Sequence, residues 1–407
     1  MPFVIFAAPI FNENAIRFIS ITADLPQVQL AVVSQEPKEN LPTEVRATLV
    51  GHWRVNDALD SGQLLWAAQS LAQQHSPIHR LIAINEQIQV PLAEAREKLG
   101  LAGQSVAVAQ NFRDKARMKS LLHQASLPCA RHWLAHSEAD VWAGVEAIGL
   151  PLVLKPPAGA GAQFTHRADS AESVTAALRQ YSPSSHQPIL LEEFIVGEEH
   201  SLDTFSLNGR VLWHSITRYL PTPLEVMRTP WLQWRAIIPR EVDEALYDDI
   251  REAGFRALEV LGMQTGMGHM EWFRRADGSL AISEVGMRPP GAQFTTLMSR
   301  AYDFDCPAAW ARLMVYGEFE PPPRKYAAGA AYLRGQGQGR VKAVHGLEEA
   351  ERELGHLVTD VKLPQIGQPA ASNYEGEGYV IVRHEETAVV EQALLRLVSL
   401  VRVELAE

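Results

Sequence analysis

The chain has 407 residues, of which 46% are hydrophobic and 21% are charged, an ordinary composition for a protein that buries large cores. Its formal net charge of −11 argues against a general binder of nucleic acids or anionic membranes, and its two cysteines are too few for a disulfide framework or a four-cysteine zinc site. Low cysteine usage, no apolar run of ~18 residues and no cationic residue ahead of the short apolar start together predict a cytoplasmic protein.

The first hundred residues alternate between short apolar runs and amphipathic stretches. The runs, which predict buried strands, lie at residues 3–8, 28–34 and 80–85. The stretches, which predict helices, lie at residues 13–24 and 91–99. This alternation indicates a parallel α/β domain. No GxGxxG motif follows the first run, so dinucleotide binding is not supported there.

The rest of the chain continues with mixed signals. Expected strands lie at residues 150–155, 189–194, 200–207, 270–275 and 279–285. A long helix is expected at 242–261 and another at 386–401 near the end of the chain. The run Pro321-Pro-Pro323 is a plausible linker before a glycine-punctuated region at 329–339.

A β-hairpin is expected around Asp277-Gly278, a strong turn signal between two of these strands. If the two residues form the turn, Glu271 faces Glu284 on one side of the hairpin, with Cβ atoms ~4.5–5.5 Å apart. Two facing carboxylates repel unless a cation lies between them. A hard divalent ion such as Mg²⁺ suits oxygen ligands beside phosphates. The alternative is an exposed acidic pair neutralised by nearby arginines.

The same register places His269 opposite Gly286 and puts Arg288 further along that face. An arginine beyond the metal pair can reach transferring phosphate oxygens with its planar fork. The alternative for Arg288 is a structural role near the prolines that follow it. Taken alone, His269 is better explained as a histidine packed within its strand.

A loop of small residues, which contains Gly159 and Gly161, follows the strand that ends at Lys155. Backbone amides without bulky side chains can approach phosphates closely. An ordinary turn is the alternative, and because no Gly-Lys dipeptide occurs, a Walker A loop is excluded.

Two lysines lie on the helix that is expected to begin at Asp114. Lys115 falls next to the apolar stripe that includes Met118, so it should point inward, toward an anion such as a phosphate or a carboxylate. Lys119 should point away. The alternative for Lys115 is a side chain that extends to solvent at the start of the helix.

The segment 189–203 joins two expected strands through a short, partly apolar connection. Such a connection can offer backbone groups to the edge of an adenine, and a glutamate further on can accept hydrogen bonds from ribose hydroxyls. Solvated acidic residues beside a turn are the alternative.

Each of these signals is weak by itself, but the order in which they occur along the chain is specific. They occur as Arg113-Asp-Lys115, Leu152-Val-Leu-Lys155 with the glycine loop, Glu192-Glu-Phe-Ile195, Gly197-Glu-Glu-His-Ser-Leu-Asp203, His269-Met-Glu271 and Ser283-Glu-Val-Gly-Met-Arg-Pro-Pro-Gly291. From about residue 3 to 401 the chain resembles the ATP-grasp superfamily. It looks most like the carboxylate–amine ligase branch, which includes the L-amino-acid ligases that make dipeptides.

The resemblance implies a nucleotide site. Lys115 and Lys155 would hold the ATP phosphates, and Gly159 and Gly161 would lie in a mobile flap over them. The residues that would meet the adenine and the ribose are Glu192, Glu193, Ile195 and Glu199.

It also implies a reaction centre. Glu271 and Glu284 would bind Mg²⁺, or Mn²⁺ in its place, and Arg288 would steady an acyl-phosphate step. His269 becomes an active-site candidate, because a histidine before that glutamate recurs in amino-acid ligases. The family commonly has Asn two residues after the second glutamate, whereas this chain has Gly286. The number of metal ions is therefore left open.

Substrate selection is expected in the segment 218–235, which in the resembling ligases runs near the acceptor side of the cleft. Trp231, Trp234 and one of Arg228 or Arg235 would shape the pocket, through an apolar wall and a bidentate contact to a carboxylate. A surface loop whose tryptophans pack on the domain is the alternative.

The fold expected is thus α/β, an ATP-grasp fold in three regions. These are an N-terminal parallel α/β (pre-ATP-grasp) domain at 1–110, an ATP-grasp domain at 111–320 with a flap subdomain at about 130–195, and a C-terminal α+β region at 321–407 that closes the cleft. The expected activity is ADP-forming ligation of an amino acid or a small carboxylic acid to an amine, by a monomer or homodimer that binds neither nucleic acid nor membrane. The alternatives are a biotin-carboxylase-like enzyme, a carboxylate–thiol ligase and a non-catalytic ATP-binding regulator.

Overall fold

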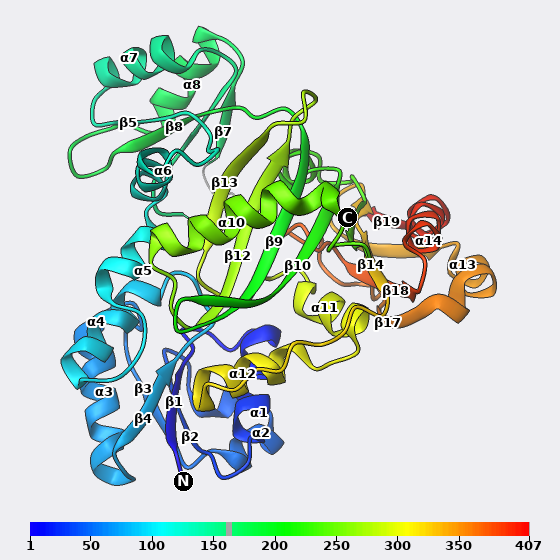
Figure 1. Ribbon diagram of the computed structural model, residues 1–407. Coiled ribbons are helices and arrows are strands. Elements are labelled where there is room, and N and C mark those ends of the chain that lie inside the picture. Colours follow the sequence, from blue (N-terminus) through cyan, green and yellow to red (C-terminus); the bar gives the residue numbers. More distant parts are fainter. Residues whose placement is uncertain (160–164, 407) are drawn as a thin grey trace.

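The computed structural model describes residues 1–159 and 165–406, which fold around the sheets seen in Figure 1. The N-terminal sheet is parallel with the order β3-β2-β1-β4. Its strands are β1 (Phe3–Ala7), β2 (Gln29–Ser34), β3 (Gly51–Arg54) and β4 (Ile78–Ile82). Its helices are α1 (Glu13–Ala23), α2 (Thr43–Thr48), α3 (Ser61–Gln74) and α4 (Gln89–Leu99). The predicted strands and helices are confirmed, and β3, α2 and α3 are additions.

A second, smaller sheet stands apart at the top of Figure 1, with two helices packed on it. Its order is β5-β8-β6-β7, from β5 (His132–Ala135), β6 (Leu152–Lys155), β7 (His166–Ala168) and β8 (Ile189–Glu193). The two helices are α7 (Glu138–Ile148) and α8 (Ala171–Gln180). It is reached from the N-terminal sheet through α5 (Val106–Arg113) and α6 (Lys115–Gln124).

A large antiparallel sheet forms the centre of the molecule, with the order β13-β12-β9-β10-β11-β14-β18-β17. Its strands are β9 (Glu198–Leu207), β10 (Arg210–Leu220), β11 (Trp234–Ile238), β12 (Gly266–Arg274), β13 (Leu280–Gly286), β14 (Ala327–Leu333), β17 (Val358–Lys362) and β18 (Gly378–His384). The helices between these strands are α9 (Pro223–Arg228), α10 (Asp248–Leu261), α11 (Phe294–Tyr302) and α12 (Cys306–Tyr316). Helix α10 crosses one face of the sheet (Figure 1).

The helix expected at 242–261 begins later, at Asp248. A short 3₁₀ turn, η2 (Ala245–Tyr247), precedes it. Asp248 and Asp249 stand in the first turn of α10, where negative charge is favoured by the helix dipole. The residues from 242 up to this turn therefore lie outside the helix.

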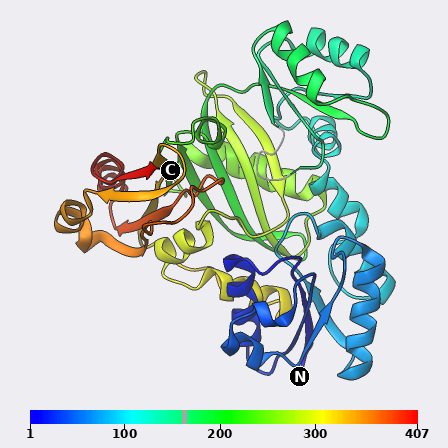
Figure 2. The ribbon, with the colours of Figure 1, turned by 180° about the vertical axis from the view of Figure 1, so that it is seen from behind.

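The C-terminal region adds strands to the large sheet, because β14 pairs with β11 and β18 pairs with β14. Gly329 on β14 is required by packing, since a Cβ there would lie 2.4 Å from Leu394. A fourth sheet contains β15 (Gly335–Gln336), β16 (Arg340–His345) and β19 (Arg402–Ala406), and its neighbouring helices are α13 (Leu347–Leu354) and α14 (Thr387–Leu400). Figure 2 shows the N-terminal sheet, the small sheet and this region arranged around the large sheet. The boundaries near residues 110 and 320 stay predictions.

The hairpin of β12 and β13 has the predicted pairs but a different turn. Glu271 pairs with Glu284 and His269 with Gly286, as expected. The turn, however, includes the hydrogen bond from Gly278 N to Arg275 O, and Gly278 has a left-handed φ of 83°. This is a three-residue loop with a glycine bulge. It shifts the register by one residue, and a second irregularity between Glu271 and Trp272 shifts it back.

Candidate active site

Most of the predicted site residues line a cavity of about 740 Å³. One wall is the small sheet and the β8–β9 connection, and the floor is the end of the β12–β13 hairpin. Glu86 reaches it from the N-terminal domain, and residues from the segment 219–229 and Tyr374 also line it. The cavity therefore lies where five distant parts of the chain meet.

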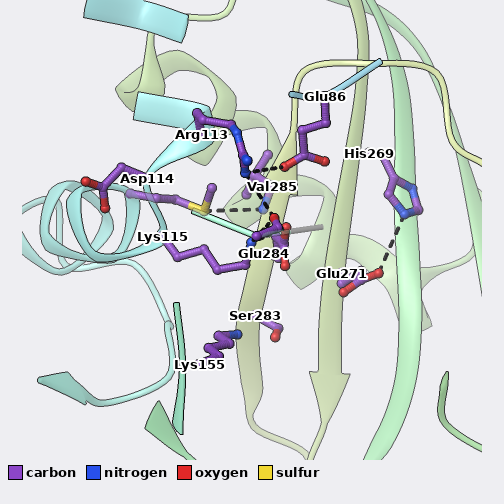
Figure 3. A network of polar contacts seen from close by, with 12 residues as sticks. Glu86, Arg113, Asp114, Lys115, Lys155, His269, Glu271, Ser283, Glu284 and Val285 are labelled. Atoms are coloured by element: carbon purple, nitrogen blue, oxygen red, sulfur yellow. Dashed lines mark hydrogen bonds and ion pairs between the residues drawn. The ribbon is translucent and has the colours of Figure 1, made fainter. Parts of the chain in front are cut away.

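Glu284 is held by a lysine at the centre of this cavity (Figure 3). Lys115 Nζ lies 2.8 Å from Glu284 Oε1, and Asp114 caps the helix that carries the lysine. Burial raises the pKa of Glu284, but Lys115 and Lys155 outweigh it and lower that pKa to about 2. The carboxylate is therefore ionised at neutral pH.

Lys155 and Lys119 both approach Glu192, which is buried. Lys155 Nζ lies 2.9 Å from Glu192 Oε2, and Lys119 Nζ lies 3.5 Å from Glu192 Oε1. Burial raises the pKa of Glu192, but the lysines hold it below its usual value. In this structure the Glu192 side chain thus orients lysines.

The expectation that Lys119 points away from the protein is wrong. Its side chain is fully buried and donates to the backbone oxygen of Ser283 at 2.6 Å. Lys115 and Lys119 are four residues apart and so share one side of α6. That side is enclosed because α6 packs against both α10 and β5.

The glycine loop is anchored at its first half. The backbone oxygen of Gly159 accepts from Lys115 Nζ and from Arg113 Nη1, each at 3.0 Å. Gly159 lines the cavity. Gly161, the other predicted flap glycine, lies outside the described residues, as does most of the loop.

The expected adenine and ribose residues all line the cavity. Glu193 pairs with Arg131 at 2.8 Å and with Arg275 at 2.5 Å. Ile195 lines the cavity in the connection that follows β8. Burial and the nearby Glu271 raise the pKa of Glu199 well above its usual value. The roles of these residues at a base and a ribose stay predictions.

His269 is fixed by an aspartate that sequence reasoning did not select. Its Nδ1 lies 2.7 Å from Asp203 Oδ1, and the fully buried Asp203 also accepts from Ser201 Oγ at 2.8 Å. Burial lowers the pKa of His269, but Asp203 outweighs it and raises that pKa to about 9. Asp203 and His269 face each other because β9 pairs with β12, which no local pattern reveals.

Arg288 is paired with Glu86, another residue that was not selected as a site residue. Its Nε lies 3.0 Å from Glu86 Oε2, and Arg113 Nη1 lies 3.7 Å from Glu86 Oε1. Burial lowers the pKa of Arg288, but Glu86 outweighs it and raises that pKa. The N-terminal domain thus orients an arginine of the hairpin end.

The four expected substrate residues are not brought together. Arg228 and the buried Trp234 line the cavity. Trp231 is 58% exposed, and neither it nor Arg235 is among the described lining residues. Trp234 stacks on Tyr332 with ring centroids 4.2 Å apart. Their roles stay predictions.

The donor set at the hairpin fits a magnesium ion. Glu271 and Glu284 both line the cavity from paired positions, and carboxylate oxygens are the ligands that Mg²⁺ prefers. Within residues 1–159 and 165–406 no cluster of three protein ligands occurs. One or two carboxylates plus nucleotide phosphates is the usual arrangement for this ion. A Cβ at Gly286 would have no neighbour closer than 3.7 Å, so packing does not require glycine there.

No protein-family model matches the chain. The L-arginine-specific L-amino acid ligase of Bacillus subtilis is 24% identical over 321 residues, which cover 74% of this chain and 76% of that protein. The alanine–anticapsin ligase of Bacillus subtilis strain 168 is 29% identical over 255 residues, or 58% of this chain and 53% of that protein. The crystal structure of an L-amino acid ligase from Bacillus licheniformis has a TM-score of 0.79 at 20% identity, over 100% of this chain and 99% of that chain.

The chain has the ATP-grasp fold, as predicted, and the resemblance drawn from the ordered motifs is confirmed. Its sequence relatives are ATP-dependent ligases that form peptide or other C–N bonds. Solved structures of this fold include complexes with ATP and with ADP. No described helix is long and apolar enough to cross a membrane.

Proposed function

We propose that this protein is an ATP-dependent carboxylate–amine ligase that forms an acyl phosphate and releases ADP and phosphate. The observation that carries the proposal is the pairing of Glu271 with Glu284 in a cavity that has Lys115 on one side and Arg288 on the other. Carboxylates for a metal, cations for phosphates and an arginine beyond them are the parts that phosphoryl transfer needs. The ligase relatives support the same reaction class.

The phosphates of ATP would bind at Lys115 and Lys155. Lys155 is held by Glu192, and Lys115 by Glu284, so both ammonium groups are oriented before the nucleotide arrives. Orientation in advance lowers the entropic cost of reaching the reactive geometry. Ile195 and its neighbours would hold the base, and Glu199 the ribose.

Glu271 and Glu284 would hold Mg²⁺, or Mn²⁺ in its place. When bound, the ion would neutralise negative charge on the phosphoryl group that is transferred. Glu271 faces the cavity with a third of its side chain exposed, so it is accessible to a cation.

The substrate carboxylate would lie near Arg288. One of its oxygens attacks the γ-phosphorus as the bond to ADP breaks, which converts a poor electrophile into an acyl phosphate. The amine nitrogen then attacks the acyl carbon, loses a proton, and phosphate leaves. Arg288, held by Glu86, would neutralise negative charge on the transferred group. His269, held by Asp203, lines the same cavity and would lie near the reacting atoms.

The two substrates would be small molecules, an amino acid or other small acid and an amine. Dipeptide formation results when both are amino acids. Cys129 and Cys306 are free thiols, which suits a reducing compartment, and we place the activity in the cytoplasm.

The test incubates the protein with ATP, Mg²⁺ and a pool of L-amino acids, measures ADP and phosphate, and identifies products by mass spectrometry. Glu271→Gln and Glu284→Gln remove charge but keep shape, and each should lower Mg²⁺-dependent ADP formation at least about tenfold. Glu259→Gln, on the exposed side of α10, is the matched control. Full activity in both hairpin variants would refute the metal assignment, and no amino-acid-dependent ADP release by the unaltered protein would refute the ligase.

A further inference from the structure

The C-terminal region contributes one side chain to the described wall of the cavity, and it is Tyr374. Every other described lining residue lies at or before Phe294. Tyr374 sits in the segment 371–377, which leads into β18. A residue from eighty positions further along the chain therefore lines the same cavity as the lysines and the hairpin.

Buried side chains fix the backbone of this segment. Trp234 Nε1 donates to the backbone oxygen of Tyr374. Arg334, which is 5% exposed, donates to the backbone oxygens of Asn373 at 2.7 Å and Pro230 at 2.9 Å. One arginine therefore ties this segment to the loop that follows α9.

A buried glutamate holds the same segment from its other side. Glu377 accepts from the backbone nitrogens of Gly335 at 2.6 Å and Ala371 at 2.8 Å. It is 4% exposed, and burying a charge is costly unless it is hydrogen-bonded. Two buried charged groups thus hold a seven-residue segment in place, which fixes the position of Tyr374.

The Tyr374 hydroxyl faces the reacting end of the cavity. It lies 3.6 Å from the position that a Cβ would take at Gly291, three residues after Arg288. Burial raises the pKa of Tyr374, and the nearby charges that act on that pKa include Arg288 and Glu271. Tyr374 is half-buried and lines the cavity, and among the described residues its hydroxyl has no hydrogen-bond partner, so the hydroxyl is open to a ligand there.

We propose that Tyr374 is a substrate-binding residue whose hydroxyl donates a hydrogen bond to an oxygen of the substrate's carboxyl group, beside Arg288. A neutral donor and a cation that converge on one place suit an anionic oxygen. The inference rests on the proposed ligase function and assigns part of its substrate recognition to the C-terminal region. We expect ATP binding to be independent of this residue, because no hydrogen bond or ion pair among the described residues joins Tyr374 to Lys115 or Lys155, the lysines that would hold the phosphates.

Tyr374→Phe removes only the hydroxyl and keeps the ring. Tyr379→Phe is the matched control, because Tyr379 is a half-buried tyrosine on β18 that does not line the described cavity. With amino acids chosen from the products of the pooled assay, Tyr374→Phe should raise the KM for the amino acid at least about tenfold, since a hydrogen bond to a charged group is lost. Binding of a fluorescent ADP analogue and the melting temperature should match those of the unaltered protein.

The outcomes separate this inference from the function on which it rests. An unaltered protein that releases no ADP with any amino acid overturns the ligase and the inference with it. An active protein whose Tyr374→Phe variant keeps the KM of Tyr379→Phe overturns the inference alone. A variant that loses ADP-analogue binding to the same extent as its activity also overturns it, because the hydroxyl would then serve the nucleotide.

Discussion

Replacing Lys119 by methionine should destabilise the protein, because this lysine is fully buried between Glu192 and the bulge at Ser283. Methionine fills the volume of the aliphatic stem but leaves the Ser283 oxygen without its donor, which costs about 1–3 kcal/mol. Breaking a buried ion pair costs about 3–5 kcal/mol, but Glu192 keeps Lys155 at 2.9 Å, so only part of that loss applies. We expect a total of about 3 kcal/mol.

Thermal unfolding followed by circular dichroism measures this loss. Since the unfolding entropy is about 2.1 cal/mol/K per residue and the chain has 407 residues, the melting temperature should fall by roughly 3–4 °C. Lys342→Met is the control, since Lys342 is 63% exposed and its pair with Glu404 is worth about 0–1 kcal/mol. The double change of Lys119→Met with Glu192→Gln should cost less than the sum of the single changes. A melting temperature for Lys119→Met equal to that of Lys342→Met would refute the reasoning.

Three further predictions concern binding, pH and substrate choice. Lys115→Met should weaken the binding of a fluorescent ATP analogue at least about tenfold, since it removes an oriented cation, and unchanged affinity would mean that the phosphates lie elsewhere. Burial lowers the pKa of His200 to about 4, so the unfolded chain takes up a proton more readily and the free energy of unfolding should fall by up to roughly 3 kcal/mol as the pH falls from about 6.5 to about 4. His200→Phe keeps a ring stacked on the neighbouring tryptophan and should reduce this dependence, and an identical pH profile would contradict it. Trp234→Ala or Arg228→Ala should change the product profile over a panel of amino acids more than Trp231→Ala does, because the first two line the cavity, and three unchanged profiles would remove the segment from the site.

Local patterns were sufficient for most single elements and for the pairing at the hairpin. Glu271 faces Glu284 because both lie on short strands that flank one turn, and side-chain alternation with period two decides the face. The predicted two-residue turn was wrong, because the loop has three residues. The pairing of the glutamates was nevertheless correct, because a second irregularity in the hairpin restores the expected register. Bulges depend on how a strand meets its other neighbour, and no local pattern reports that.

Helix phase was a weaker guide. The apolar stripe of α6 correctly indicated that Lys115 points inward, but it misplaced Lys119, which is four residues further on. The sequence of a helix does not show whether a polar residue faces the protein interior or solvent, because that depends on which distant residues pack against it. Glu192 and Ser283, which provide those partners, are over seventy residues away along the chain.

The sequence by itself determined the α/β class, the ordered motifs and the residues of the hairpin, because these depend on periodicity and spacing within short segments. Only the tertiary structure decided which side chains complete the site. Asp203 meets His269 because β9 lies beside β12, Glu86 meets Arg288 because the N-terminal domain ends at the cavity, and Tyr374 arrives from the C-terminal segment. Sheet order and the packing of distant segments bring these groups together, and both are set by the balance of burial over the whole chain rather than by any local pattern.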